Sequence, residues 1–193
     1  MHEILLIGGG GHCISCIDVI EKEKKYKIAG IVDNTLQTNN TQEVLGYPIL
    51  GTDEDLEKLR RYFSHALVTI GQIISPTPRI QLYKNLKNLD FVLPTIISPL
   101  AYIAKNVTIS EGSIVMHHAL INTSSKIGKM CIINTKALIE HGCTIQDFCH
   151  ISTAAVLNGD CIVEEQSFIG SNMGIKHGQT IKKKSIIFKD IFK

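Results

Sequence analysis

A six-residue repeat runs through the second half of the chain and limits what it can fold into more than any other feature. Every sixth residue from Ile97 to Ile187 is aliphatic. A helix would place apolar residues every three to four positions and a strand every two, so neither template fits. The repeat predicts a solenoid in which three hexapeptides form each coil and stacked coils bury a column of aliphatic and small side chains. The small residues stand four positions after most of the aliphatic ones, at Ala101, Ser113, Ala119, Ser125, Cys131, Ala137, Cys143, Cys149, Ala155, Cys161, Ser167 and Ser185.

Composition agrees with a narrow solenoid and excludes several classes of function. Aromatic residues make up only 6% and Trp is absent, as expected where the interior has no room for large rings. Lys and Arg number 20 against 18 Asp and Glu, so the concentrated basic surface that nucleic acid requires is not expected. The first apolar run, Ile4 to Ile7, meets glycines after four residues and is too short for a membrane anchor or a signal-peptide core. We therefore expect a cytoplasmic protein.

The six cysteines do not predict a metal site. Cys13 and Cys16 form a C-x-x-C at the start of an expected helix, where helix packing is favoured over redox chemistry. Disulfides are not expected without a secretory signal. The other four, Cys131, Cys143, Cys149 and Cys161, fall on the small inward position of the repeat and are predicted to be core residues.

The first half of the chain has a different pattern. All five prolines lie at or before Pro99, which predicts a domain at residues 1–95 followed by the solenoid at 96–193. Strands and helices alternate there with tight glycine turns, which favours a small parallel sheet in an α/β domain. The expected strands are 3–7, 27–32, 47–50, 66–70 and 90–93, and the expected helices are 13–24, 53–63 and 79–89.

A glycine-rich turn links the first strand to the first helix. Gly8 to Gly11 lets backbone N–H groups approach a phosphate at the positive end of a helix. Asp33 ends the second strand, where an acidic group can accept a hydrogen bond from a ribose. Cys13 stands where the third glycine of G-x-G-x-x-G would be. We favour nucleotide binding over a merely structural turn or NAD-dependent hydride transfer.

Histidines of the solenoid are the candidates for acid–base chemistry. His141 follows the inward Ile139 by two residues and is expected to project outward on a flat face, where a neutral imidazole can take a proton. His150 is expected at a corner. His117 and His177 share the repeat position of His141, and His177 is expected in the same column two coils away, at roughly 10 Å. Solvent-exposed decoration is the alternative for each.

Several ordered motifs accompany the repeat: I-L-L-I-G-G-G-G-H (4–12), V-D-N (32–34), G-Y-P-I-L-G (46–51), T-I-G-Q (69–72) with Arg79, I-N-T-K-A-L-I-E-H-G-C-T-I (133–145), F-C-H-I-S (148–152) and F-I-G-S (168–171). In these motifs the chain resembles the NeuD-like family of hexapeptide-repeat sugar acyltransferases, which includes sialic acid O-acetyltransferases and N-acetyltransferases of nucleotide-linked amino sugars. The resemblance implies a Rossmann-like nucleotide-sugar-binding domain and a left-handed parallel β-helix that binds acetyl-CoA along its face. It also implies a homotrimer with active sites between subunits.

Roles for individual residues follow from the same resemblance. His141 matches the general base that deprotonates the acceptor as it attacks the thioester, and Asn134 matches a polar residue close to that base. His150 matches a second active-site histidine near the acetyl group and, with Gly170, is assigned to the cofactor. The residues assigned to the sugar nucleotide are Gly8, Gly10, His12, Asp33, Gly71 and Arg79.

Two features depart from the family pattern. Gly142 stands directly after the base, where the family usually carries an acidic residue, and Glu140 on the other side is expected to face a different way. The chain also ends without the final coil and tail that help to cover the pantetheine arm of CoA, which predicts an effect on CoA affinity.

The expected function is acetyl-CoA-dependent acetylation of a nucleotide-linked amino sugar in bacterial surface glycan biosynthesis. The alternatives are O-acetylation of a sialic-acid-like sugar and a catalytically impaired homologue that still binds the sugar nucleotide. An amino-acid acceptor, as in serine acetyltransferases, is disfavoured by the small α/β domain with its glycine-rich turn.

Overall fold

The computed structural model describes residues 1–188, and its contacts divide the chain into two units. The first unit comprises Met1–Gly71 and Pro78–Pro94, and the second comprises Gln72–Thr77 and the chain from Thr95 onward. The expected absence of a covering tail concerns the end of the chain, where residues 189–193 lie outside the described residues. Within the described residues, no helix is long and apolar enough to span a membrane.

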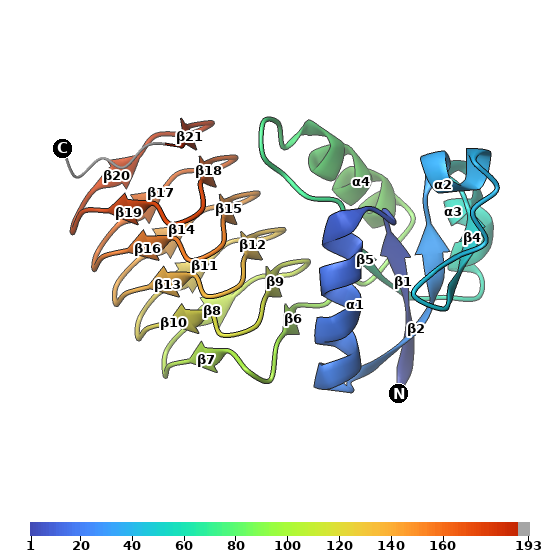
Figure 1. Ribbon diagram of the computed structural model, residues 1–193, viewed down its shortest axis with the longest axis horizontal. Coiled ribbons are helices and arrows are strands. Elements are labelled where there is room, and N and C mark those ends of the chain that lie inside the picture. The colour runs from blue at the N-terminus through green and yellow to red at the C-terminus, as the bar shows by residue number, and fades with distance from the viewer. Residues whose placement is uncertain (189–193) are drawn as a thin grey trace. The chain divides into compact units, whose positions relative to one another are not determined.

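The first unit is built on a five-stranded sheet of order β3-β4-β2-β1-β5 (Figure 1). β1, β2, β4 and β5 are parallel, as predicted, and β3 pairs antiparallel with β4. Ile4 to Ile7 of β1 are buried, as expected for an interior strand of a parallel sheet, and β1 lies between β2 and β5. The strands are β1 (His2–Ile7), β2 (Tyr26–Val32), β3 (Glu43–Val44), β4 (Tyr47–Gly51) and β5 (His65–Val68).

Helices of this unit follow the strands with some departures from the prediction. The helix expected at 53–63 is a short 3-10 turn followed by α3, since a capping box between Thr52 and Asp55 fixes a tight first turn. The strand expected at 90–93 is reduced to an isolated bridge between His65 and Val92, and Asp90 before it has a positive φ. The helices are α1 (Gly11–Glu23), α2 (Asn34–Thr38), the 3-10 turn η1 (Asp53–Asp55), α3 (Leu56–Arg60) and α4 (Thr77–Asn88).

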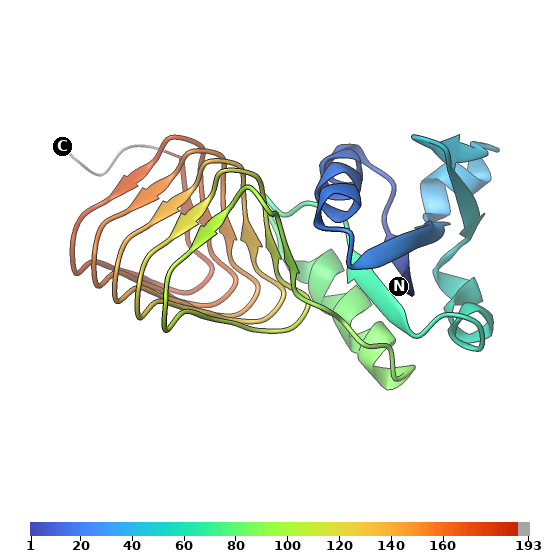
Figure 2. The same cartoon turned by 90° about the horizontal axis from the view of Figure 1, so that it is seen from below.

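The second unit is the predicted left-handed parallel β-helix of hexapeptide repeats. Each repeat contributes a two-residue strand, and the strands stack into three parallel sheets (Figure 2). Partners are eighteen residues apart, as for Leu120 and Leu138. The strands are β6 (Ile96–Ile97), β7 (Tyr102–Ile103), β8 (Thr108–Ile109), β9 (Ile114–Val115), β10 (Leu120–Ile121), β11 (Lys126–Ile127), β12 (Ile132–Ile133), β13 (Leu138–Ile139), β14 (Thr144–Ile145), β15 (His150–Ile151), β16 (Val156–Leu157), β17 (Ile162–Val163), β18 (Phe168–Ile169), β19 (Gly174–Ile175), β20 (Thr180–Ile181) and β21 (Ile186–Ile187).

Aliphatic and small side chains fill the interior of the β-helix, as the repeat predicted. Burial raises the pKa of the Cys143 thiol to about 11 and that of Cys149 well above its ordinary value. Cys131, Cys143, Cys149 and Cys161 are all buried in the interior cluster, so their predicted role as core residues is confirmed.

The corners of the β-helix share one backbone conformation. In repeat after repeat from residue 103 onward, the residue three positions after the inward aliphatic residue has a positive φ. Gly142, Ala154 and Asp160 are examples. Such a left-handed residue reverses the chain tightly between two strands, and here residues other than glycine adopt it too. This rule places His141 and Gly142 in the turn after β13, and it corrects two of the predictions.

Each strand consists only of the inward aliphatic residue and the residue before it. His141 comes two residues after Ile139, so it lies in the turn and not on a flat face. His150 was expected at a corner, yet it is the first residue of β15 and is buried. The histidine predicted on a face is therefore at a corner, and the one predicted at a corner is in a strand.

Candidate active site

The glycine-rich turn after β1 is held by backbone and side-chain contacts within the first unit. Gly8 has a φ of +105°, and a Cβ there would collide with the side chain of Ile70. Its carbonyl accepts a 2.6 Å hydrogen bond from Thr69 Oγ1. A Cβ at Gly10 would meet nothing within 4 Å, so the turn is open on that side, where α1 begins. This end of α1 offers free approach to backbone N–H groups.

Asp33 connects this turn to α2. Its Oδ2 accepts from Gly9 N at 2.8 Å, and its Oδ1 accepts from Leu36 N at 2.8 Å. The carboxylate is thus the N-cap of α2 and a brace for the glycine turn. The predicted contact with a ribose would have to share these oxygens with the backbone.

A cavity of about 390 Å³ opens beside Gly8 and Asp33 at the carboxyl ends of the parallel strands. Ligands bind at this edge of open α/β sheets. Asn34 and Asp53 add polar groups to its wall, and they are bonded to each other through Asn34 Nδ2 and Asp53 Oδ2 at 3.1 Å. The remaining lining is Ile7, Val32, Thr35, Ile70, Pro78, Gln81, Leu82 and Asn85.

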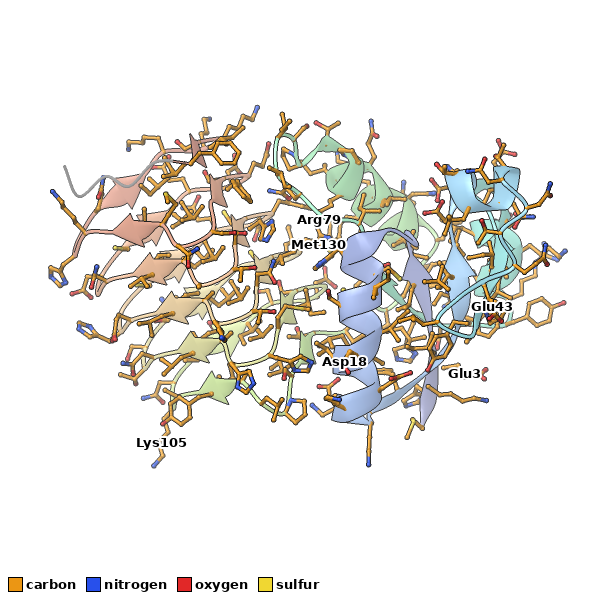
Figure 3. The ribbon with its side chains drawn as sticks, in the orientation of Figure 1. Glu3, Asp18, Glu43, Arg79, Lys105 and Met130 are labelled. Carbon is orange, nitrogen blue, oxygen red and sulfur yellow. The ribbon has the colours of Figure 1, made fainter. Side chains whose placement is uncertain are left out.

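The other residues assigned to the sugar nucleotide do not line this cavity. His12 is the second residue of α1 and half-buried, and a Cβ added to Gly71 would lie 3.8 Å from the His12 Cβ, so these two residues are neighbours. Arg79 in α4, labelled in Figure 3, is buried and donates from Nη1 to the carbonyls of Val68 (3.1 Å) and Ile70 (2.7 Å). Arg79 thereby fastens the chain that leaves β5.

His141 lies at the corner between β13 and β14, with 54% of its side chain exposed. Its ring rests over Gly159 on the next coil: a Cβ there would lie 2.6 Å from Cε1 and 2.7 Å from Nε2. Nδ1 lies 3.9 Å from Oδ1 of Asp160. The rings of His141 and His177 have centroids 6.4 Å apart, so the shared column is confirmed, with the rings closer than the expected backbone spacing.

His150 is in a different environment from His141. Its Nδ1 lies 2.5 Å from the carbonyl oxygen of Gln72, which fixes the proton on Nδ1, and its Nε2 accepts from Asn134 Nδ2 at 3.2 Å. Its ring meets Phe168 edge-on, with centroids 5.1 Å apart. Asn134 was expected close to His141, but the structure pairs it with His150. Both nitrogens of His150 are engaged by the protein.

Two further predicted positions have structural contacts. Gly170 follows β18, and a Cβ there would lie 2.7 Å from the carbonyl oxygen of Ile187, so glycine allows the next coil to approach. His117 shares a 2.6 Å hydrogen bond with Ser98 Oγ through Nδ1.

Sequence reasoning missed Asp160 and Gly159. The signal that could have found them is the length of a coil: residues eighteen apart are stacked, so Gly159 lies beneath His141 and Asp160 beneath Gly142.

A small α/β unit with a ligand cavity, followed in the chain by a hexapeptide β-helix with an exposed histidine at one corner, defines a hexapeptide-repeat acyltransferase. The PglD N-terminal domain family matches residues 3–86. The acetyltransferase domain of PglB from Neisseria gonorrhoeae FA1090 is 30% identical, with a TM-score of 0.84 over 93% of this chain and 85% of that one. The same domain has been solved in complex with acetyl coenzyme A.

A second relative is perosamine N-acetyltransferase from Caulobacter crescentus, solved as a mutant in complex with CoA and GDP-perosamine. It is 30% identical, with a TM-score of 0.80 over 95% of this chain and 90% of that one. Among curated protein sequences, none matches this chain significantly. The chain belongs to the NeuD-like family of sugar acetyltransferases, as its resemblance predicted.

Proposed function

We propose that this protein transfers the acetyl group of acetyl-CoA to the amino group of a nucleotide-linked amino sugar, in the cytoplasmic steps of bacterial surface glycan biosynthesis. The single observation that carries the proposal is His141, which is exposed at a β-helix corner with a carboxylate 3.9 Å from Nδ1. An imidazole so placed has an acidic partner on one nitrogen and a basic lone pair for the other. The two relatives, which bind acetyl-CoA or CoA and, in one case, GDP-perosamine, support the choice of substrates.

The reaction is a direct transfer without an acyl-enzyme. The amine nitrogen attacks the thioester carbonyl carbon and forms the C–N bond, while His141 takes the proton that the nitrogen loses. The C–S bond then breaks, and the sulfur leaves with the bonding electrons and receives the proton from the imidazolium. The products are the N-acetylated sugar nucleotide and CoA thiol. Rigid placement of both substrates supplies much of the rate enhancement.

The nucleotide part of the acceptor is assigned to the cavity beside Gly8 and Asp33. The open glycine turn and the start of α1 suit the diphosphate, and the amide of Asn34 and the carboxylate of Asp53 are offered to the nucleoside. Gly10, His12 and Gly71 then border the phosphates and the sugar. Arg79 contributes by holding the chain after β5 in place.

A homotrimer completes the proposal. His141 lies in the turn between β13 and β14, whereas His150 begins β15 and Asn134 directly follows β12, which neighbours β15 in a sheet that contains neither β13 nor β14. Within one subunit these groups lie at different sides of the β-helix, so a single active site that uses both must take them from neighbouring subunits. Light scattering during size-exclusion chromatography is expected to give three times the mass of one chain.

The test of function is the release of CoA thiol across UDP-, GDP-, dTDP- and CMP-linked amino sugars, each beside its hydroxyl counterpart. We expect turnover with an amino sugar and little with its hydroxyl analogue; the reverse result would favour O-acetylation. His141→Ala is expected to lower kcat about 10²- to 10⁴-fold, as loss of a general base does. His118→Ala removes an exposed histidine at another corner and is expected to retain full activity. A His141→Ala enzyme with near-normal kcat would contradict the proposed mechanism.

A further inference from the structure

The corner that carries His141 has an alternating pattern of side chains and glycines. Because stacked residues are eighteen apart, one column contains His141, Gly159 and His177, and the column beside it contains Gly142, Asp160 and Gly178. Each bulky residue in one column therefore has glycines around it. This arrangement leaves space at the corner for three polar side chains from three successive coils.

Gly142 and Asp160 compete for the same space. A Cβ on Gly142 would collide with Oδ1 of Asp160, whereas it would lie 3.8 Å from the Asp160 Cα, an ordinary contact. The obstacle is thus the carboxylate and not the backbone that carries it. An acidic side chain at position 142 would therefore have its Cβ where the Asp160 carboxylate lies, so the two side chains exclude each other at this corner beside His141.

The Asp160 carboxylate lies between two histidines. Oδ1 is 3.9 Å from His141 Nδ1, and Oδ2 is 3.7 Å from His177 Nε2. The 3.9 Å separation is longer than a hydrogen bond, and such contacts at catalytic sites commonly shorten when substrate binds. More than half of the Asp160 side chain is exposed, so the attraction is moderate in water.

We propose that Asp160 is the positioning residue of His141 and takes the place of the acidic residue that position 142 lacks. The inference rests on the proposed function, in which His141 is the general base. Asp160 accepts from the Nδ1 proton, which selects the imidazole tautomer with its lone pair on Nε2, and it stabilises the imidazolium that forms when the amine loses its proton. Asp160 thus places a carboxylate near His141 in space, although the residue that follows His141 in the sequence is a glycine.

Kinetics of Asp160→Asn and Asp160→Ala test this role. Both variants are expected to lower kcat about 10- to 100-fold, less than His141→Ala, with little change in KM for acetyl-CoA. Both replacements are compatible with the corner, since Ala154 adopts the same positive φ at another corner and Asn tolerates it. Asp147→Ala is the matched control, because it removes another corner carboxylate that bonds to the preceding coil, at Lys129, and is expected to leave kcat unchanged.

A double variant moves the carboxylate from one coil to the other. Gly142→Asp combined with Asp160→Ala places an acid directly after the base and opens the space that it needs. We expect this variant to recover kcat to within a few-fold of the unmodified enzyme. Gly142→Asp alone is expected to disturb the corner, because the new Cβ would overlap the carboxylate of Asp160.

Nitrogen-15 NMR of the imidazole supplies a readout that is independent of turnover. At a pH where His141 is neutral, its signal, assigned by its loss in His141→Ala, is expected to show a proton on Nδ1. In Asp160→Ala the proton is expected to move toward Nε2, and in the double variant to return. An unchanged tautomer, or full kcat in both Asp160 variants, overturns the inference. If His141→Ala itself keeps full activity, the proposed function fails instead, whatever the NMR result.

Discussion

Gly159→Ala is expected to displace the imidazole of His141, the proposed general base, without disturbing the fold. The added Cβ would lie 2.6 Å from Cε1 and 2.7 Å from Nε2 of His141, and ordinary contacts begin at 3.4 Å. The ring must therefore move by about 1 Å. Misplacement of a reacting group by about 1 Å can lower the rate about 10²-fold, which corresponds to about 2.7 kcal/mol in the activation free energy.

The backbone itself accepts this substitution. Gly159 is not among the residues of positive φ, so alanine meets no conformational strain there. Alanine also restricts the unfolded chain, which favours folding by about 0.4–1 kcal/mol where the native conformation suits it. We expect an unchanged or slightly higher melting temperature together with the loss of kcat.

The assay is steady-state release of CoA thiol with the best acceptor from the sugar-nucleotide panel, beside thermal unfolding of the same preparation. Gly178→Ala is the control, because it lies one coil below Asp160 and its added Cβ would meet nothing within 4 Å. It is expected to retain kcat. A Gly159→Ala enzyme that turns over as fast as the control would show that the reaction does not need the ring where the structure places it.

Two other predictions concern the two units separately. Asp33→Ala removes the N-cap of α2 and the hydrogen bond from Gly9 N, so it is expected to lower the free energy of unfolding by about 1 kcal/mol, or Tm by roughly 2–4 °C. It is also expected to weaken binding of a nucleoside diphosphate in calorimetry. Glu54→Ala, at an exposed position, is the control and is expected to change neither quantity. Thiol reagents at pH 8 are expected to label none of the cysteines rapidly in the native protein and all of them after unfolding. The reason is that burial raises the pKa of Cys13 and Cys143 to about 11, which leaves about 10⁻³ of each as thiolate at this pH. Rapid labelling of Cys13 in the native protein would support a redox role instead.

The fold could be predicted from the sequence because it follows from periodicities. Ile139 and Cys143 point inward for the same reason as their equivalents in every repeat, so a single register fixed the whole interior. The turn after β1 and its Asp33 were found from their spacing along the chain. The short α2 was missed because five residues carry too little pattern to be recognised, and its stability comes from the Asp33 cap.

Side-chain positions at the corners could not be predicted from one repeat read by itself. His141 and His150 were assigned to the wrong parts of their repeats because the strand comprises two residues and the turn begins earlier than expected. The contact between Asn134 and His150 was missed because it joins neighbouring coils, whereas the prediction followed the order of residues along one coil.

In this β-helix, a side chain has neighbours one position away along the chain and others eighteen positions away in the coils above and below. A functional group can therefore be supplied from either direction, provided that the competing position is small. Gly142 and Asp160 meet that condition, since only the carboxylate of Asp160 blocks a side chain at position 142. The glycine after His141 is thus compatible with a carboxylate beside the His141 ring, because Asp160 supplies it from the next coil. A comparison of sequence motifs alone would have predicted that this carboxylate is absent.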